Sequence, residues 1–167
     1  KNKEFSTTVS PDITGPKRYE QLADLIRFYK PETLVEVGTW NGGRAIEIAL
    51  AAFTNTDEFT YIGYDLFEDC TEQLDKLELN SKPHNSLKAV KNRLTEFQQK
   101  ISLKGKAFHF TLTKGDTNNT LKLAVDDPDL GPQLADFAFI DGGHSEGTVN
   151  SDYNSLKSVP VVVFDDF

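Results

Sequence analysis

The 167-residue sequence is poor in cysteine and has no long apolar run. Its single cysteine, Cys70, has no partner for an internal disulfide. No apolar segment approaches the ~20 residues that a membrane-spanning helix needs, and the first residues lack the apolar core of a signal peptide. We therefore expect a cytoplasmic protein that does not bind membranes.

Basic residues are also scarce, with 18 Lys and Arg against 26 Asp and Glu and a net charge of −8. This charge repels phosphate backbones and anionic lipid surfaces. Binding to nucleic acid is therefore disfavoured, although a local basic patch could still exist. The length and the 38% hydrophobic content favour one domain over residues 1–167, since two cores would each be small.

Short apolar strands alternate with helical patterns along the chain. The sequence predicts strands at residues 34–37, 59–64, 107–112, 137–140 and 161–164. It predicts helices at residues 19–29, 45–52, 86–101 and 146–156, with Ser86 as an N-cap. Uninterrupted apolar strands suit a parallel sheet that helices cover on both faces. The predicted fold class is α/β, a Rossmann-like doubly wound parallel sheet.

The segment at residues 67–104, between the second and third predicted strands, is longer than a simple connection. It forms either a lid over the strand ends or a surface helix packed on the sheet. Cys70 has no identifiable histidine partner there, so we expect a small neutral residue rather than a nucleophile. The sequence around His84 and His109 indicates no special role for either residue.

The chain stops three residues after the apolar core of the fifth predicted strand. We expect a C-terminally incomplete chain, because nothing remains to cover that edge of the sheet. An uncovered strand could pair with a second copy of the chain, giving a homo-oligomer.

Polar residues gather in and after the predicted strands. They are Glu36, Gly38, Asn41, Asp65, Asp116, Asp141, Asp165 and Asp166. A single aspartate at a strand end is usually a cap or a turn former. Ligands of open parallel sheets, however, bind beyond the carboxyl ends of the strands. The repetition over five strands therefore favours one crevice that collects most of these side chains.

The glycine turn at residues 36–43 differs from the G-x-G-x-x-G fingerprint of dinucleotide enzymes, because Trp40 stands where the second glycine would be. That glycine normally lets a pyrophosphate approach the backbone. A nucleoside ligand without phosphates therefore fits this turn better than a dinucleotide does. Asp65 follows Gly42 near the spacing of roughly 20 residues at which an acid bonds ribose hydroxyls.

Residues 34–42, LVEVGTWNG, resemble the first motif of class I S-adenosylmethionine-dependent methyltransferases, in the form typical of the small-molecule O-methyltransferase branch. Tyr64-Asp65 is similar to the second motif, residues 114–117 to the third and residues 139–145 to the fourth. The resemblance covers roughly residues 19–167. It implies methyl transfer to a hydroxylated small molecule, on a sheet of strand order 3-2-1-4-5 whose usual sixth and seventh strands are missing from this chain.

The same resemblance implies a set of residues that bind S-adenosylmethionine. They are Glu36, Gly38, Thr39, Trp40, Asn41, Gly42, Asp65, Asp116, Thr117 and Asp141. Gly38 and Gly42 would let the backbone approach the methionine part, Asp65 would hold the ribose, and the 116–117 pair would flank the adenine. A sulfonium cation without phosphates suits an acid-rich crevice.

Asp141, Asp165 and Asp166 form a second group, at the ends of two neighbouring predicted strands. Oxygen ligands of this kind suit Mg²⁺, which in the resembling enzymes holds the substrate hydroxyl and lowers its pKa. The alternative is an acidic turn. Asp141 and His144 are the expected catalytic residues. His144 acts as a general base or as a hydrogen-bonding neighbour.

Two other functions stay open. One is a methyltransferase-like binding module without turnover. The other is an NAD-dependent oxidoreductase, which the missing glycine pattern disfavours. The identity of the methyl acceptor does not follow from the sequence.

Overall fold

The computed structural model describes residues 11, 13, 17–125, 127 and 131–165. In this part of the chain the strands form one parallel sheet of order β3-β2-β1-β4-β5. The strands are β1 (Thr33–Val37), β2 (Glu58–Asp65), β3 (Ala107–Lys114), β4 (Phe137–Ile140) and β5 (Val161–Phe164). The predicted α/β class and strand order are therefore confirmed.

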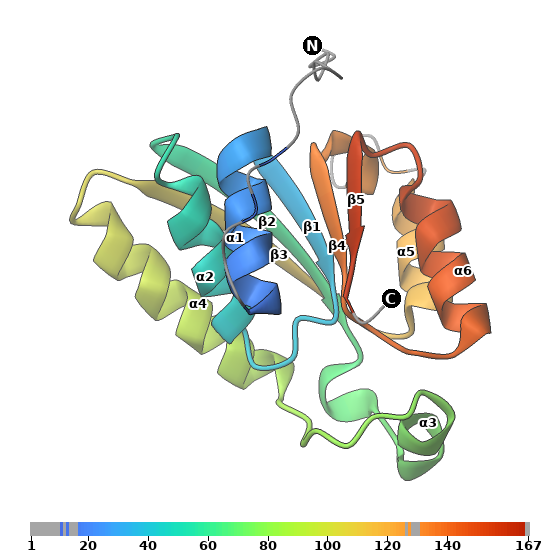
Figure 1. The fold of residues 1–167 in the computed structure, drawn as a ribbon. Coiled ribbons are helices and arrows are strands. Elements are labelled where there is room, and N and C mark those ends of the chain that lie inside the picture. The colour runs from blue at the N-terminus through green and yellow to red at the C-terminus, as the bar shows by residue number, and fades with distance from the viewer. Residues whose placement is uncertain (1–10, 12, 14–16, 126, 128–130, 166–167) are drawn as a thin grey trace.

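Helices cover both faces of the sheet (Figure 1). One face carries α1 (Arg18–Tyr29), α2 (Gly43–Ala52) and α4 (Leu87–Ser102), and the other carries α5 (Thr117–Val125) and α6 (Glu146–Leu156). The short helix α3 (Glu72–Leu77) lies beyond the sheet, past the tips of the strand arrows. Two 3₁₀ turns, η1 (Phe67–Asp69) and η2 (Pro132–Leu134), complete the described elements. No helix of this described part is both long and apolar enough to span a bilayer.

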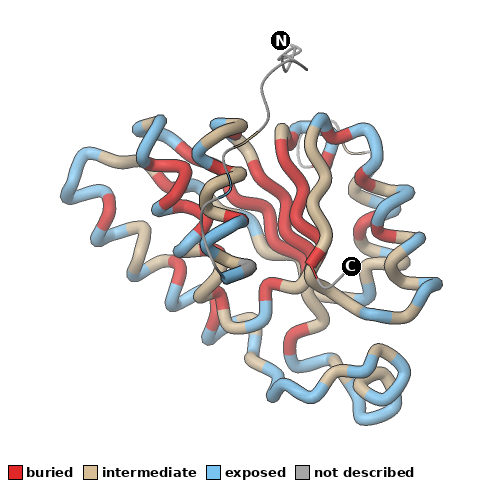
Figure 2. Tube along the Cα trace, viewed as in Figure 1, coloured by how far each residue is buried: buried red, intermediate tan, exposed pale blue. Residues whose placement is uncertain are grey.

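Two apolar cores sandwich the sheet because successive side chains of a strand point to opposite faces. In β1, Leu34 packs in the core under α1, α2 and α4, whereas Val35 and Val37 pack in the core under α5 and α6. Figure 2 shows the central strands buried along their length. Burial of each large apolar side chain contributes about 1.5–3 kcal/mol to stability.

The helix α4 follows the predicted pattern closely. The Ser86 hydroxyl accepts the N–H of Ala89 at 3.2 Å and caps the helix. Val90, Leu94 and Ile101 are its buried residues, on the face that the periodicity indicated.

The helix α5 was not predicted. Its sequence, TNNTLKLAV, begins with four weak helix formers, and Leu121 is the one residue that it buries, so its apolar pattern is short. Asp116 starts it by accepting the N–H of Asn118 at 2.9 Å.

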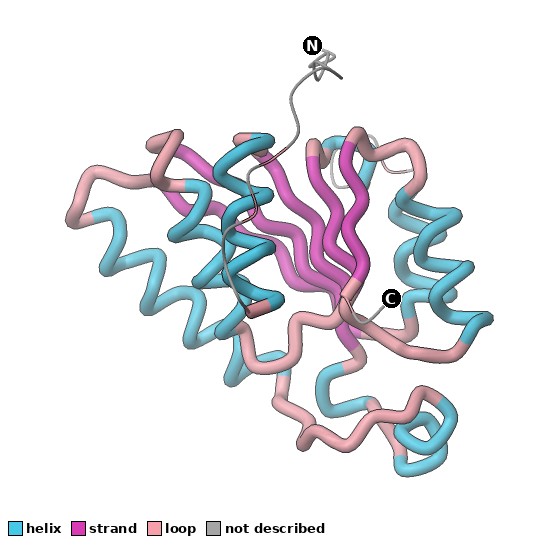
Figure 3. Tube along the Cα trace, in the orientation of Figure 1, coloured by secondary structure: helices cyan, strands magenta, loops and turns pink. Residues whose placement is uncertain are grey.

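The register of the sheet aligns the strand ends. Val37 of β1 lies opposite Tyr64 of β2 and Ile140 of β4. Ile140 in turn lies opposite Phe164 of β5. The residues that follow these positions therefore meet along one edge, where Figure 3 shows a cluster of loops.

Candidate functional site

A cavity of about 800 Å³ opens at this edge of the sheet. Its size is typical of a site for a small molecule or cofactor. The following predicted site residues line it: Gly38, Thr39, Trp40, Asn41, Asp65, Asp116, Thr117, Asp141 and His144. Glu36, Gly42 and Asp165 lie outside its lining, and Asp166 falls outside the described residues. The structure thus brings most of the predicted set together, while their individual roles stay predictions.

The turn after β1 depends on two glycines with positive φ, +94° at Gly38 and +75° at Gly42. A Cβ at Gly38 would overlap the carbonyl oxygen of Asp141, and one at Gly42 would lie 3.0 Å from Cγ1 of Val90. The structure shows one reason for both glycines, namely the close approach of the β4–α6 loop and of α4. Their expected role of making room for a cofactor stays a prediction.

Glu36 lies beneath this turn and is fully buried. Its Oε2 accepts a hydrogen bond from the Tyr61 hydroxyl, which is also 3.2 Å from Oγ1 of Thr39. Burial raises the pKa of Glu36 to about 8, and the nearby charges of Asp141 and Asp65 act in the same direction. Glu36 therefore carries a proton at neutral pH and supports the turn through Tyr61.

Asp65 ends β2 and joins the turn to the second strand. Its Oδ2 accepts the N–H of Trp40 at 2.6 Å, and its Oδ1 accepts the N–H of Phe67 at 2.6 Å. Burial raises the pKa of this carboxyl, and these backbone hydrogen bonds counteract the rise. Each carboxylate oxygen can accept a further hydrogen bond, so Asp65 can still accept hydrogen bonds from hydroxyl groups of a ligand.

Residues 66–86, which we name the β2–α4 segment, are tied to the turn after β1. Nε1 of Trp40 donates to the carbonyl of Pro83 at 2.9 Å, and Nζ of Lys82 lies 5.6 Å from the centre of the indole ring. Behind this contact, Arg93 of α4 donates to the carbonyl of Asn41 at 2.9 Å. Trp40 therefore joins one end of the segment to the cavity wall.

Glu78 ties the same segment to the opposite wall. Its carboxylate accepts the N–H of Ser145 at 2.8 Å, the hydroxyl of Ser145 at 2.9 Å and the hydroxyl of Thr148 at 2.7 Å. Burial raises the pKa of Glu78, but these hydrogen bonds outweigh it and the pKa is lowered. The β2–α4 segment thus reaches across the cavity from the turn after β1 to the start of α6, the position expected of a lid.

The group predicted to bind metal lies at the ends of β4 and β5. Asp141 lines the cavity, whereas Asp165 is buried with 7% of its surface exposed. The backbone N–H of Asp165 donates to the carbonyl of Ile140 at 3.0 Å, so the two aspartates start adjacent loops. The oxygen donors fit a hard cation in type. His144 is exposed in the loop that follows Asp141.

Sequence reasoning missed a polar cluster in the β2–α4 segment. The Cys70 thiol lies 3.4 Å from Oδ1 of Asp75, and Nε2 of His84 lies 2.9 Å from both carboxylate oxygens. The expectation that Cys70 has no histidine nearby is therefore wrong, because the donor atoms of Cys70 and His84 lie within 4.8 Å of each other. His84 thus takes part in a polar cluster that its sequence context did not indicate. The segment has no periodic pattern, so nothing in the sequence indicated how it folds back on itself.

Asp152 was also missed. It is fully buried on α6, and burial raises its pKa to about 6, with the charges of Asp116 and Glu78 adding to the rise. Asp152 lies one turn before the buried Leu156. A carboxylate on the apolar face of a predicted helix was the available signal.

The charged side chains in the cavity lining are predominantly acidic. It contains six acidic side chains, those of Glu47, Asp65, Asp75, Glu78, Asp116 and Asp141. It contains two basic ones, those of Arg44 and Lys82. This balance favours a cationic or zwitterionic ligand over a diphosphate.

An open parallel sheet with order 3-2-1-4-5 and a cavity at its carboxyl edge defines a Rossmann-like fold. A family model described as a methyltransferase domain matches residues 35–167. The chain belongs to this methyltransferase domain family. The resemblance read from the four motifs is thereby confirmed.

Two solved methyltransferase structures have a similar fold. The O-methyltransferase TomG from Streptomyces achromogenes, involved in tomaymycin synthesis and solved with SAM, aligns with a TM-score of 0.60 at 16% identity over 89% of this chain and 54% of its own. The SAH-bound methyltransferase PaMTH1 from Podospora anserina aligns with a TM-score of 0.50 at 16% identity over 89% of this chain and 51% of its own. The chain spans about half the length of each, and the likeness concerns the fold. No curated protein shows significant sequence similarity to the chain.

Proposed function

We propose that this chain binds S-adenosylmethionine and transfers its methyl group to an oxygen of a hydroxylated small molecule. The observation that carries the proposal is the convergence of Asp65, Asp116 and Asp141 on one acid-lined cavity beside the glycine turn. Membership of the methyltransferase domain family supports it.

The carboxylates at the strand ends bind different parts of the cofactor. Asp65 accepts the ribose hydroxyls, since its oxygens are already oriented by the N–H groups of Trp40 and Phe67. Asp116 is fixed by Asn118, whose backbone and side-chain N–H groups donate to it at 2.9 and 3.0 Å, and it lies beside the adenine. The turn after β1 borders the methionine end.

The bound cofactor supplies an electrophilic methyl group on a sulfonium. His144 accepts the proton that the acceptor hydroxyl loses, and its exposure at the cavity wall allows this contact. Asp141 and Asp165, together with Asp166, are the residues that would hold Mg²⁺, whose chemistry lowers the pKa of a bound hydroxyl. The donor types support these roles, and Asp141 and His144 both line the cavity.

Isothermal titration calorimetry with S-adenosylhomocysteine tests the cofactor assignment. We expect saturable binding, and about 10- to 100-fold weaker binding by Asp65→Asn, because a hydrogen bond to a charged group is worth about 1.5–3 kcal/mol. Asp57→Asn is the matched control, since Asp57 precedes β2 at its opposite end and pairs with Lys106. A folded protein that binds NADH and no S-adenosyl compound would overturn the proposal.

Turnover requires a separate assay. Methyl transfer to a panel of hydroxylated acceptors is measured with and without Mg²⁺, using the wild type and Asp141→Asn. We expect transfer by the wild type and a loss in the variant. Cofactor binding without transfer to any acceptor would instead favour the binding-module alternative.

A further inference from the structure

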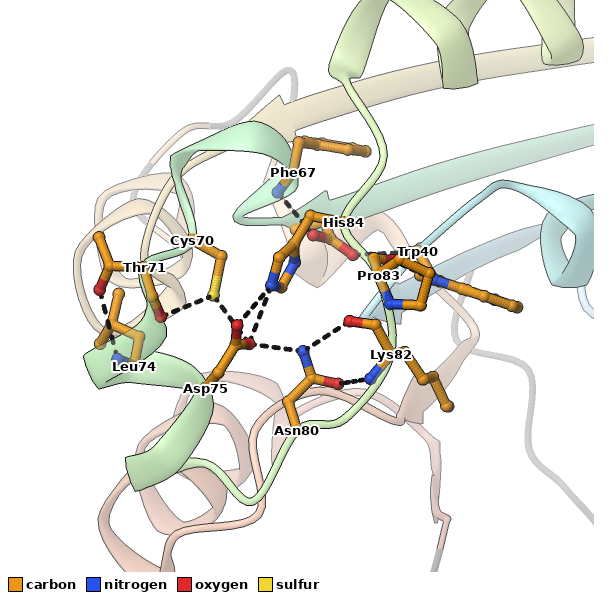
Figure 4. A network of polar contacts seen from close by, with 11 residues as sticks. Trp40, Phe67, Cys70, Thr71, Leu74, Asp75, Asn80, Lys82, Pro83 and His84 are labelled. Atoms are coloured by element: carbon orange, nitrogen blue, oxygen red, sulfur yellow. Dashed lines mark hydrogen bonds and ion pairs between the residues drawn. The ribbon is translucent and has the colours of Figure 1, made fainter.

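The β2–α4 segment gathers three side chains with metal-binding chemistry. Cys70 follows η1, Asp75 lies in α3, and His84 precedes α4. One donor atom from each lies within 4.8 Å of the other two. Figure 4 shows the three side chains pointing toward one another. Among the residues that the structure describes, this is the one group of three or more such side chains with their donor atoms so close.

The separations of these atoms are close to those around a bound zinc ion. Sγ of Cys70 lies 3.4 Å from Oδ1 of Asp75, which lies 2.9 Å from Nε2 of His84. Tetrahedral zinc with bonds of ~2.3 Å to sulfur and ~2.0 Å to nitrogen and oxygen would require about 3.5 and about 3.3 Å for these edges. These two edges need changes of a few tenths of an ångström at most. The third edge, from Sγ of Cys70 to Nε2 of His84, is under 4.8 Å and would have to be about 3.5 Å around the ion.

We propose that Cys70, Asp75 and His84 bind a divalent cation of the zinc class. Thiolate and imidazole are ligands that zinc prefers and that Mg²⁺ does not, so this site differs in selectivity from the aspartates at the ends of β4 and β5. All three residues line the cavity. A cation held by these three residues would therefore lie at the wall of the cavity.

The surroundings hold Asp75 in position. Nδ2 of Asn80 donates to Oδ1 of Asp75 at 2.7 Å, and Oδ1 of Asn80 accepts the N–H of Lys82 at 3.0 Å (Figure 4). Hydrogen bonds of this kind orient the carboxylate ligands of metal sites. The contacts of Trp40 and Glu78 anchor the segment on both sides of the cluster.

The thiol of Cys70 also has a raised pKa. Burial raises the pKa of Cys70 to about 11, and the hydrogen bond to Asp75 acts in the same direction. The thiol is therefore a poor nucleophile at neutral pH. Binding of the cation replaces this proton, which passes to the solvent, while His84 binds as neutral imidazole.

Cobalt(II) is the probe that tests the site, used as a spectroscopic substitute for zinc on the reduced, chelator-treated full chain. We expect a sulfur-to-cobalt charge-transfer band in the near ultraviolet and visible bands of tetrahedral intensity, both lost when Zn²⁺ is added. Because Cys70 is the single cysteine, a thiolate band can come from no other residue. The readout involves no S-adenosyl compound, so its outcome is independent of the proposed function.

Variants distinguish a site from a chance contact. Cys70→Ser should lose the thiolate band, and His84→Ala should weaken cobalt binding by at least the ~10- to 100-fold typical of losing an outer partner. His109→Ala is the matched control, since His109 is an exposed histidine on β3 beside Glu58 and should leave the titration unchanged. Circular dichroism verifies that each variant is folded. A folded wild type without a thiolate band, or a His84→Ala titration equal to that of the wild type, would overturn the proposal.

Discussion

At the scale of single residues, the site depends on two backbone segments that cross so closely that a side chain at the crossing point would not fit. The turn after β1 crosses the loop that begins at Asp141, and Gly38 is the crossing point. Its N–H donates to the carbonyl of Tyr64 at 2.8 Å, so the turn is fixed to β2 as well. The conformation of this turn and the position of Asp141 are therefore set by one contact.

Replacing Gly38 by alanine should be more destabilising than replacing a glycine with a similar φ in open space. Gly105→Ala supplies that control, because Gly105 has a φ of +75° and nothing within 4 Å of its added Cβ. Backbone strain alone should cost about 1–3 kcal/mol in either variant. Gly38→Ala adds the overlap with Asp141, so its free energy of unfolding in urea should fall further. Equal losses in the two variants would show that the crossing is looser than the structure indicates.

Glu36 illustrates how a residue of the first motif can act without contacting the cavity. Its raised pKa means that the carboxyl is neutral at pH 7, whereas the carboxylates in the lining supply the negative charge. A neutral Glu36 can also accept the hydrogen bond from Tyr61 without the free-energy cost of burying a charge. The motif acid thus shapes the turn, and Asp65 remains free to contact a ligand.

At the scale of elements, the β2–α4 segment enters the apolar core only at its start, through Phe67, and polar contacts hold the rest of it. Its helix α3 has no buried residue, and Figure 2 shows exposed and half-buried residues there. Elements with few buried apolar contacts open at low free-energy cost. The hydrogen bonds of Glu78 to Ser145 and Thr148 are therefore a main restraint on this segment.

Replacing Glu78 by alanine should release the segment without unfolding the sheet. We expect amide hydrogen exchange in residues 70–86 to accelerate about tenfold or more, because removing a charged acceptor costs about 1.5–3 kcal/mol. Exchange in β1 and β4 should be unchanged. Glu72→Ala in the first turn of α3 is the control, since Glu72 is exposed. Unaltered exchange in residues 70–86 of the Glu78 variant would contradict the restraint.

The elements that the sequence predicted are those with a strong apolar pattern. The bounds of β4, β5 and α6 agree with the expected ranges, and Ser86 caps α4 as predicted. The elements that escaped prediction are α3, which buries no residue, and α5, which buries only Leu121, so neither shows a long apolar pattern. Contacts between distant residues, such as those of Glu78 at the end of α3 with Ser145 and Thr148, leave no trace in a local pattern.

At the scale of the whole molecule, parallel topology explains why so much of the site followed from the sequence. Every strand ends at the same edge, so polar residues after separate strands converge even though they are far apart in the chain. The topology does not determine which of these residues face the cavity. Glu36 and Asp165 are buried beside it, and the Cys70 cluster comes from a segment outside the sheet.

A ligand in this cavity would contact loops from four strands and the β2–α4 segment at once, so its binding should stabilise the whole domain. At a free S-adenosylhomocysteine concentration 100 times Kd, linkage adds about 2.7 kcal/mol to the free energy of unfolding. For a domain of this size, that free energy corresponds to a rise in Tm of about 5–10 °C. NAD⁺ at the same concentration should leave Tm unchanged, because the acidic lining repels its diphosphate. Thermal unfolding followed by circular dichroism measures both, and equal shifts with the two ligands would show that the lining does not discriminate by charge.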